Sequence, residues 1–378
     1  MRPTSLCVSA LLISCAVLAN GWHQSQASAS RSPDAQASPA GQGATATSAK
    51  APSQSAPSKS STVTLDWADV IEAEVDPAVV TDAGFRDAIK ATGLPWRVRD
   101  KGTNIEMLLI PPGEFVMGKS RGDDQGERDE IPAHDVKSLG DEQADKNELP
   151  AHEVTLTKAF YLGRYEVTQQ QYARVTKLTP SRFSHPAEPT VPTLEALMAD
   201  GATKSQAERE VSEAKEKLES WIAARQQPAP DAKGKERPVE MVSWDDCSAF
   251  CKSTGMRLPT EAEWEYACRA GTRTPRYGEL GEVAWWNKSE TGAVGTKRAN
   301  ALGLHDMLGN VWEWVNDWYG VYSADPQTDP HGPSTGPGRV FRGVSSVNSS
   351  YYCRASLRVN SYPGYASFDI GFRAARTP

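Results

Sequence analysis

Histidine is scarce in this sequence: the chain has six histidines among 378 residues, and none lies in a recognisable nucleophile motif. A serine–histidine–acid hydrolase needs a histidine beside its nucleophilic serine. The sequence therefore gives no support to a hydrolase of that class. His134 and His152 occupy matching positions in a near-repeat of residues 129–136 and 147–154. We interpret the near-repeat as a local duplication, although two histidines in similar settings could also form a metal pair.

Positive charge is not in excess either. The chain has 41 Lys and Arg residues against 48 Asp and Glu residues, which gives a net charge of -7. It contains no basic patch and no stripe of aromatic residues interleaved with lysines, the features that suit contact with a phosphate backbone. We therefore expect no nucleic-acid partner.

A long apolar run is missing as well. Residues 6–19 are apolar but too short to span a bilayer comfortably, and they follow Arg2, a pattern typical of a signal peptide. We expect residues 1–29 to direct export to the periplasm or the cell surface. Cys15 ends a Leu-Ile-Ser-Cys string that resembles a lipobox, so a lipid-anchored protein and simple secretion with cleavage near Ala29 both remain open. Contact with a membrane would arise only through such an anchor.

Large apolar side chains are almost absent from residues 24–61, which consist mainly of Ala, Ser, Gln, Pro and Gly. Such a segment cannot bury enough apolar surface to offset its ordering entropy, so we expect a disordered tether. The part able to fold begins near Leu65. Residues 62–103 are predicted to form a helical lead-in, with short helices over residues 66–89.

We predict one large domain over residues 104–378. Residues 104–118 contain two strand-like runs on either side of a Pro-Pro-Gly turn, which predicts a β-hairpin. Two insertions interrupt the domain: a charged loop at 119–148 and a helical segment at 193–235. Apolar residues at three- and four-residue steps in the second insertion predict an amphipathic helix that packs on the body of the domain or pairs with a partner. They are Ala207, Val211, Ala214, Leu218 and Trp221.

Two further helices are predicted from their capping residues. Ser243 precedes apolar residues at helical spacing, and Gly255 ends that helix. Thr260 and Glu263 form a capping-box pattern at the start of the next helix. The rest of the domain is rich in Gly, Trp, Asn and Tyr and has only short strand-like runs. We therefore expect an irregular, loop-rich α+β fold with little regular secondary structure.

Six segments resemble the signature segments of the formylglycine-generating enzyme (sulfatase-modifying factor) family, and they occur in the family's order. They are Gly-Glu-Phe-Val-Met-Gly at 113–118, Tyr-Glu-Val-Thr-Gln at 165–169, Pro-Val-Glu-Met-Val-Ser-Trp at 238–244, Arg-Leu-Pro-Thr-Glu-Ala-Glu-Trp-Glu-Tyr-Ala at 257–267, Gly-Asn-Val-Trp-Glu-Trp at 309–314 and Gly-Phe-Arg at 371–373. The resemblance implies a C-type-lectin-like fold. It does not fix an activity, because the family includes oxidases, accessory domains and ligand-display proteins.

The resemblance also implies a structural calcium ion at residues 306–313. Its ligands would be the side chains of Asp306 and Glu313 and the backbone carbonyls of Gly309 and Val311. Carboxylate and carbonyl oxygens are the ligands that calcium prefers in proteins. The alternative is that Glu313 caps a backbone group or pairs with an arginine in the core.

The family's oxidases bind copper(I) through two cysteines five residues apart, because this soft metal needs thiolates. Counted from Gly343, Cys353 matches the second cysteine and Asn348 occupies the position of the first. Counted back from Arg358, even Cys353 does not fall on the position of the second cysteine. Since an amide cannot replace a thiolate for copper(I), we expect neither copper nor formylglycine generation, and Cys353 is only a candidate catalytic residue. Iron oxidases of the superfamily need a histidine cluster, which this sequence lacks.

Four cysteines lie in the domain, and export would place them in an oxidising compartment. The resemblance pairs Cys268 with Cys353 in a disulfide. Cys247 and Cys251 are four residues apart on one predicted helix, a poor geometry for a bridge. They are therefore either buried thiols or weak ligands for a soft metal.

Residues 345–369, here called the C-terminal strip, contain no Lys, Glu, Gln, Met or Trp but seven Ser, four Tyr and two Asn. Tyrosine gives rigid contact area and Ser and Asn give adaptable hydrogen bonds, as in antibody paratopes. The strip resembles the variable region of proteins that bacterial retroelements diversify. The alternative is a Ser- and Tyr-rich family tail without a binding role.

We therefore predict an exported binding protein whose C-terminal strip contacts a protein or a glycan, with calcium as a structural cofactor. The rival is an oxygen-dependent oxidoreductase of the family that modifies exported sulfatases or another substrate. The predicted ligand-binding residues are Val347, Asn348, Ser349, Ser350, Tyr351, Tyr352, Leu357, Val359, Asn360, Ser361, Tyr362, Tyr365, Ser367, Phe368 and Asp369.

Overall fold

The computed structural model describes residues 64–119, 146–184, 193–199, 203–225 and 236–378. The chain divides into two units, Met1–Ser60 and Ser61–Pro378, and every described residue belongs to the second. The predicted signal peptide and tether, Cys15, His134 and most of the charged insertion at 119–148 lie outside the described residues. Within the described part of the chain, no helix combines the length and the apolarity needed to cross a membrane.

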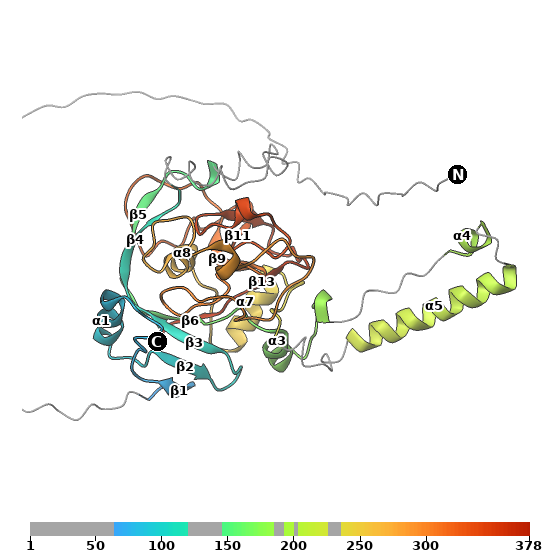
Figure 1. Cartoon of the computed structure of the whole chain (residues 1–378), viewed down its shortest axis with the longest axis horizontal. Coiled ribbons are helices and arrows are strands. Elements are labelled where there is room, and N and C mark those ends of the chain that lie inside the picture. The colour runs from blue at the N-terminus through green and yellow to red at the C-terminus, as the bar shows by residue number, and fades with distance from the viewer. Residues whose placement is uncertain (1–63, 120–145, 185–192, 200–202, 226–235) are drawn as a thin grey trace, which may run out of the picture. The chain divides into compact units, whose positions relative to one another are not determined.

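An antiparallel five-stranded sheet joins distant parts of the chain in the order β1-β2-β3-β6-β14 (Figure 1). Its strands are β1 (Ala68–Glu72), β2 (Arg97–Asp100), β3 (Glu106–Ile110), β6 (Phe160–Gly163) and β14 (Ala375–Arg376). The helical lead-in expected at residues 62–103 is therefore largely wrong. Only α1 (Ala83–Ala91), capped by Asp82, is a helix there. The β-branched pair Val70 and Ile71 favours a strand once β2 supplies backbone partners.

Strands β3 and β4 do not form the predicted hairpin. β4 (Gly113–Met117) pairs with β5 (His152–Leu156), and β5 also pairs with β10 (Gln327–Thr328). β3 pairs instead with β2 and β6. Both strands form as predicted, but they belong to different sheets. Pro111 and Pro112 between them have no backbone N–H with which to continue a ladder.

A four-stranded sheet in the order β12-β11-β9-β13 lies at the centre of the domain (Figure 1). Its strands are β12 (Arg358–Ser361), β11 (Arg339–Arg342), β9 (Trp312–Trp318) and β13 (Ile370–Phe372), and a further pair is formed by β7 (Ala284–Trp285) and β8 (Leu308–Gly309). Aromatic side chains pack edge to face beside it. The ring centroids of Trp314 and Phe341 are 5.0 Å apart, and those of Phe372 and Phe250 are 5.3 Å apart.

Three helices begin at capping boxes, in which the cap residue and the third helical residue exchange hydrogen bonds. They are α3 (Gln169–Thr176) after Thr168, α7 (Trp244–Ser253) after Ser243 and α8 (Glu261–Arg269) after Thr260. The helices predicted from Ser243 and Thr260 are confirmed. The short helices are η2 (Arg182–Ser184), α9 (Leu280–Val283) and η3 (Ser350–Tyr352). This mixture of short helices and small sheets confirms the α+β fold class.

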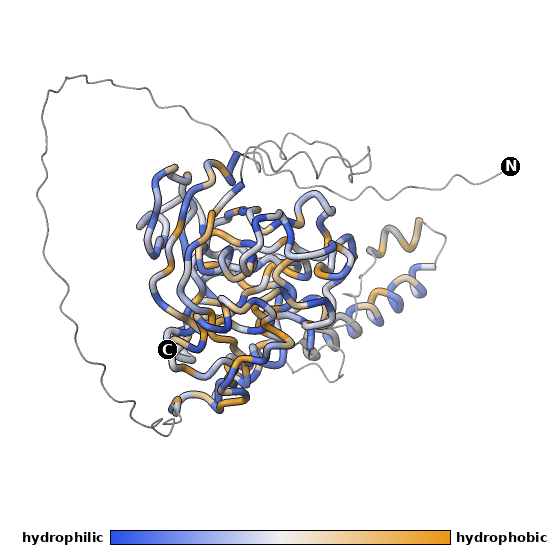
Figure 2. Tube along the Cα trace, turned by 60° about the vertical axis from the view of Figure 1, so that its left-hand side comes forward, coloured by the Kyte–Doolittle hydropathy of each residue, from blue (hydrophilic) through white to orange (hydrophobic). Residues whose placement is uncertain are grey.

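The helix predicted in the insertion at 193–235 is confirmed as α5 (Lys204–Arg225), which contacts α4 (Leu194–Ala199). Polar and apolar positions alternate along α5 (Figure 2). Ala207 is buried, and Val211 and Ala214 are partly buried. The side chains of Leu218 and Trp221 lie outside the described part. Packing of this helix on the domain or on a partner stays a prediction.

Candidate functional site

The C-terminal strip consists of a buried framework between exposed runs. Residues 353–358 are buried, whereas 347–352 and 359–369 are partly or fully exposed, and Tyr362 keeps 61 % of its surface. Leu357 is fully buried, so its prediction as a ligand-binding residue is wrong: its apolar side chain packs in the core and cannot reach a ligand. The other fourteen predicted residues are all at least partly accessible.

Buried ion pairs fix this framework. Arg354 donates to Glu148, with Nε 3.0 Å from both carboxylate oxygens, and Ser356 Oγ donates to the same carboxylate at 2.6 Å. Arg358 donates from Nε and Nη2 to the two oxygens of Glu261, each at 2.7 Å. Paired donors of this kind hold a side chain in one orientation. These pairs attach the strip to Glu148, in the segment just before β5, and to Glu261, in the first turn of α8.

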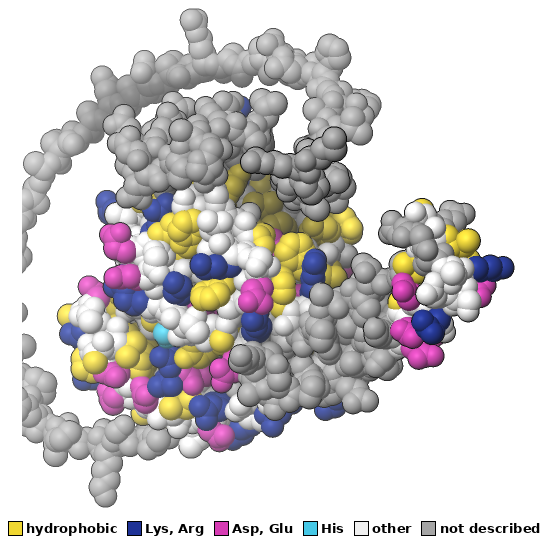
Figure 3. All heavy atoms as spheres, turned by 45° about the vertical axis from the view of Figure 1, so that its right-hand side comes forward, with side chains coloured by type: hydrophobic (Ala, Val, Ile, Leu, Met, Phe, Trp, Pro, Cys, Tyr) yellow, Lys and Arg dark blue, Asp and Glu magenta, His cyan; other side chains and the backbone are white. Residues whose placement is uncertain are grey.

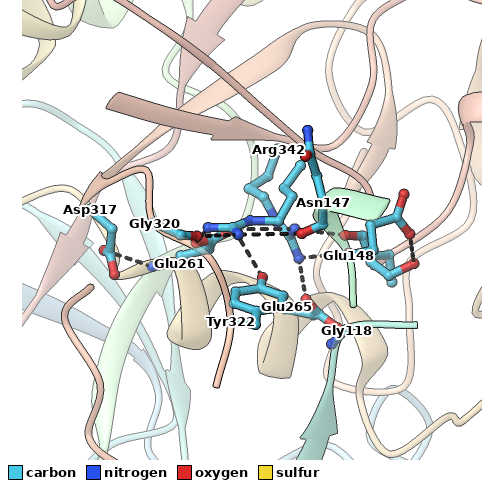
Figure 4. Close-up of polar contacts among 12 residues, drawn as sticks. Gly118, Asn147, Glu148, Glu261, Glu265, Asp317, Gly320, Tyr322 and Arg342 are labelled. Atoms are coloured by element: carbon cyan, nitrogen blue, oxygen red, sulfur yellow. Dashed lines mark hydrogen bonds and ion pairs between the residues drawn. The ribbon is translucent and has the colours of Figure 1, made fainter. Parts of the chain in front are cut away.

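The pairs belong to a larger buried network (Figure 4). Arg342 lies between Glu265, to which it donates, and Glu261, whose Oε1 is 3.4 Å from its Nη1. Burial alone would raise the pKa of Glu265, but Arg269 and Arg342 hold it below its usual range. Asp317 accepts from the backbone N–H of Glu261 at 2.9 Å, and the charge of Arg358 only partly offsets its burial. Burial and the nearby Glu261 carboxylate raise the pKa of Asp317 to about 8.

Asn348, which we predict to occupy the position of the family's first copper cysteine, uses its side chain to hold a turn. Its Oδ1 accepts from the backbone N–H of Ser345 at 3.1 Å and from Ser345 Oγ at 2.6 Å. Ser345 Oγ is also 3.0 Å from Asp369 Oδ2. Cys353 is fully buried, and its thiol donates to the Ser349 carbonyl at 3.7 Å. These neighbours supply oxygen atoms and one sulfur atom.

The predicted disulfide between Cys268 and Cys353 is absent from the structure. The Cys268 thiol donates instead to the Met307 carbonyl at 3.8 Å, and no disulfide joins the cysteines of the described part of the chain. Burial raises the pKa of Cys268 to about 12. Cys247 and Cys251 are also buried in the core, and burial raises the pKa of both thiols, which favours their interpretation as buried thiols.

Two of the implied calcium ligands, Asp306 and Glu313, lie near Arg373. Glu313 accepts from Arg373 Nη2 at 2.8 Å and from Trp264 Nε1 at 2.7 Å, so it pairs with a core arginine, as the alternative expected. Asp306 is buried and accepts from the Gly295 N–H at 2.5 Å. Gly309 and Val311 would contribute backbone carbonyls. Gly309 ends β8, and Val311 lies just before β9.

A third acid, Glu166, faces the same region. Its Oε1 accepts from Asn310 at 3.1 Å, while its buried Oε2 has no hydrogen-bond partner among the described residues. Burial and the charge of Asp306 raise the pKa of Glu166 well above its usual range, and burial raises that of Asp306 to about 6. Three carboxyl groups thus lie near Arg373, which is paired with Glu313, and a hard divalent cation there would neutralise negative charge. No cluster of three His, Cys, Asp or Glu side chains in metal-binding arrangement occurs in the described ranges, but the implied set has only two side chains.

Three residues beside the strip were not predicted. The ring centroids of Phe183 and Phe368 are 6.0 Å apart, and the Arg182 guanidinium lies 5.1 Å from the Phe368 ring. The backbone N–H of Met241 donates to the Ser367 carbonyl, and its side chain is exposed. These contacts are tertiary, and no local pattern in the sequence indicates them.

Comparison with known proteins decides the family. Residues 95–378 match the sulfatase-modifying factor enzyme 1-like domain. The chain belongs to this family. It is 31 % identical over 311 residues to the formylglycine-generating enzyme of Streptomyces coelicolor, covering 71 % of this chain and 88 % of that protein. It is 27 % identical over 311 residues to the inactive Cα-formylglycine-generating enzyme 2 of Bos taurus, covering 74 % of this chain and 91 % of that protein.

Solved structures of this sulfatase-modifying factor fold agree with the family assignment. Treponema denticola variable protein 1 superimposes with a TM-score of 0.52 at 25 % identity, covering 72 % of this chain and 95 % of that chain. PvdO from Pseudomonas aeruginosa superimposes with a TM-score of 0.52 at 23 % identity, covering 75 % and 98 %. The C-type-lectin-like fold is thereby confirmed. The fold hosts several functions, so function has to be argued from the site.

Proposed function

We propose that this sulfatase-modifying factor family member is a binding protein that presents residues 347–369 to a protein or glycan ligand and does not oxidise substrates with copper. The observation that carries the proposal is the side chain of Asn348. It stands where a thiolate is needed, and its oxygen is already occupied by Ser345. A copper(I) centre built on positions 348 and 353 would have one sulfur ligand from them, Cys353.

The arrangement of the strip supports binding. Its exposed runs are rich in Tyr, Ser and Asn, and the buried framework between them is held by the pairs of Arg354 with Glu148 and Arg358 with Glu261. A rigid scaffold reduces the entropy lost when a ligand binds. The neighbouring Phe183 and Met241 add apolar contact area at its edge.

Export and calcium belong to the same proposal. The apolar run at residues 6–19 supports export, with lipidation at Cys15 or simple secretion as the two routes. Calcium, held by Asp306, Glu313 and the carbonyls of Gly309 and Val311, would stabilise the scaffold beneath the strip. The partnerless oxygen of Glu166 supports a cation at this place.

The rival function is oxidation of an exported substrate, as in formylglycine formation. The identity of 31 % to a formylglycine-generating enzyme favours it. Copper(I) titration, combined with oxygen-dependent turnover of a Cys-x-Pro-x-Arg peptide, separates the two functions. We expect neither stoichiometric copper binding nor an aldehyde product, while a two-cysteine family oxidase serves as the positive control. Copper binding with product would overturn the proposal.

The binding function is tested by changing the strip without touching its framework. In the full chain, Tyr362→Ser combined with Tyr365→Ser removes exposed aromatic surface, and Val321→Ser is the control because Val321 is 87 % exposed outside the strip. On an array of glycans and extracellular proteins, we expect ligands that bind the wild type and the control but not the double variant. Equal binding profiles of all three proteins would contradict a role for the strip.

A further inference from the structure

A cavity of about 940 Å³ lies beside α3. It is lined by the first turns and the end of α3, by the end of β2 and the turn that follows it, and by Tyr165. No residue of 345–369 lines it. Its volume is in the range of cavities that hold small organic ligands. A ligand in this cavity would therefore contact none of the strip residues.

Three cations line the cavity, together with two carboxylates. The cations are Arg99, Arg174 and Lys177, and the carboxylates are those of Glu106 and Glu236. Within the described part of the chain, neither Arg174 nor Lys177 lies within 4.0 Å of a carboxylate, and the single contact of Arg99, to Glu106, is 3.5 Å long. Glu106 is already bound more closely by two other arginines. Figure 3 shows a face of the molecule on which positive and negative side chains are interspersed. An anionic group is the ligand that these cations suit.

Gln169 adds an unused hydrogen-bond acceptor to the lining. Its side chain is only 7 % exposed, and its Nε2 donates to the Pro238 carbonyl at 3.3 Å. Its Oε1 is buried and has no hydrogen-bond partner in the part of the chain that the structure describes. A buried acceptor without a partner is unfavourable, so a ligand hydroxyl or amine that donates to it would be bound with some selectivity.

Tyr165 supplies a fixed aromatic ring at the same cavity. The ring is partly exposed and lies 5.1 Å from the ring of His305, with the Arg164 guanidinium 5.4 Å from its centroid. A ring held in this way offers contact area at little cost in entropy.

We propose that this cavity binds an acidic saccharide. The carboxylate or sulfate of the sugar pairs with Arg174, Lys177 and Arg99, a ring hydroxyl donates to Gln169 Oε1, and Tyr165 contacts the sugar ring. A carboxylate and a sulfate both carry the negative charge that the cations bind. The uronate and sulfated probes used in the test distinguish the two groups.

The test is calorimetric titration of the full chain with three tetrasaccharides: a uronate, a sulfated and a neutral one. We expect binding of at least one acidic probe with a Kd below about 1 mM, weakened by salt, and at least tenfold weaker binding of the neutral probe. Arg174→Gln with Lys177→Gln should weaken the acidic probe about tenfold or more. Gln169→Met, which keeps the side-chain length but removes the acceptor, should weaken it about three- to tenfold.

Two controls make the result specific. Lys90→Gln removes one positive charge from the exposed last turn of another helix, α1, and should leave affinity unchanged. Tyr362→Ser should also leave it unchanged, which separates this cavity from the strip. Absence of binding by every acidic probe, equal binding of the neutral probe, or an equal loss in Lys90→Gln would each overturn the proposal.

Discussion

Arg358 and Glu261 form a buried two-pronged ion pair: Nε and Nη2 of the arginine lie 2.7 Å from Oε1 and Oε2 of the carboxylate. Arg358 opens β12 in the C-terminal strip, and Glu261 opens α8, 97 residues earlier. The pair therefore ties the proposed binding surface to the centre of the domain.

Breaking this pair should cost much more stability than breaking an exposed one. Glu261→Ala leaves the Arg358 charge buried and unpaired, and we expect a loss of about 3–5 kcal/mol in the free energy of unfolding, measured with urea. Glu282→Ala is the matched control. It breaks a pair with Arg298 in which both side chains are more than half exposed, and should cost less than about 1 kcal/mol. Equal losses would contradict the structural role of the buried pair.

Features specified by short stretches of sequence were predictable. The capping boxes at Ser243 and Thr260 involve residues three positions apart, so the sequence alone locates these helix starts. The strands on either side of Pro111 could likewise be predicted, but not their partners. Pairing depends on β2, β5 and β6, and nothing within residues 104–118 indicates which of them each strand meets.

Features specified by distant residues were not predictable. Arg354 and Glu148 are 206 residues apart, and neither carries a local signal of the other. The burial of Leu357 follows from that framework and not from the composition of the strip. The position of Glu166 could not be predicted either. The segment at 165–169 indicated the family, but only the fold brings Glu166 near Asp306.

Asp317 should make stability depend on pH. Its pKa is about 8 in the folded protein because of burial, against about 3.9 for an unfolded aspartate. Between these values the unfolded chain binds fewer protons than the folded one, so stability falls as pH rises from about 4 to about 8. Asp317→Asn keeps an acceptor for the Glu261 N–H but cannot ionise. Urea unfolding at pH 5, 6.5 and 8 should show the variant losing less stability with pH than the wild type; parallel profiles would rule this out.

Calcium should stabilise the protein through the acids around Arg373. With calcium at 100 times its Kd, we expect about 2.7 kcal/mol of added stability, seen as a higher Tm than in chelator. Asp306→Asn should abolish the calcium-dependent part of the Tm, whereas Glu282→Gln, which alters an exposed acid elsewhere, should keep it. A Tm that does not respond to calcium in the wild type would argue against a bound cation.

Reduction should not destabilise the protein, because Cys268 and Cys353 are thiols that donate to backbone carbonyls. Protein recovered from an oxidising compartment should have the same Tm with and without dithiothreitol. Loss of a native bridge typically costs about 2–5 kcal/mol, so a bridge would be revealed by a clear drop in Tm on reduction. Mass spectrometry after alkylation gives an independent count of the thiols.

Residues 370–376 place β13 beside β9 in the central sheet and β14 beside β6 in the five-stranded sheet. During synthesis, neither sheet has all its strands until this segment has left the ribosome. Clipping by a protease after residue 369 would remove a strand from both sheets at once. Such a product would be a damaged domain with open edges, not a shortened functional one.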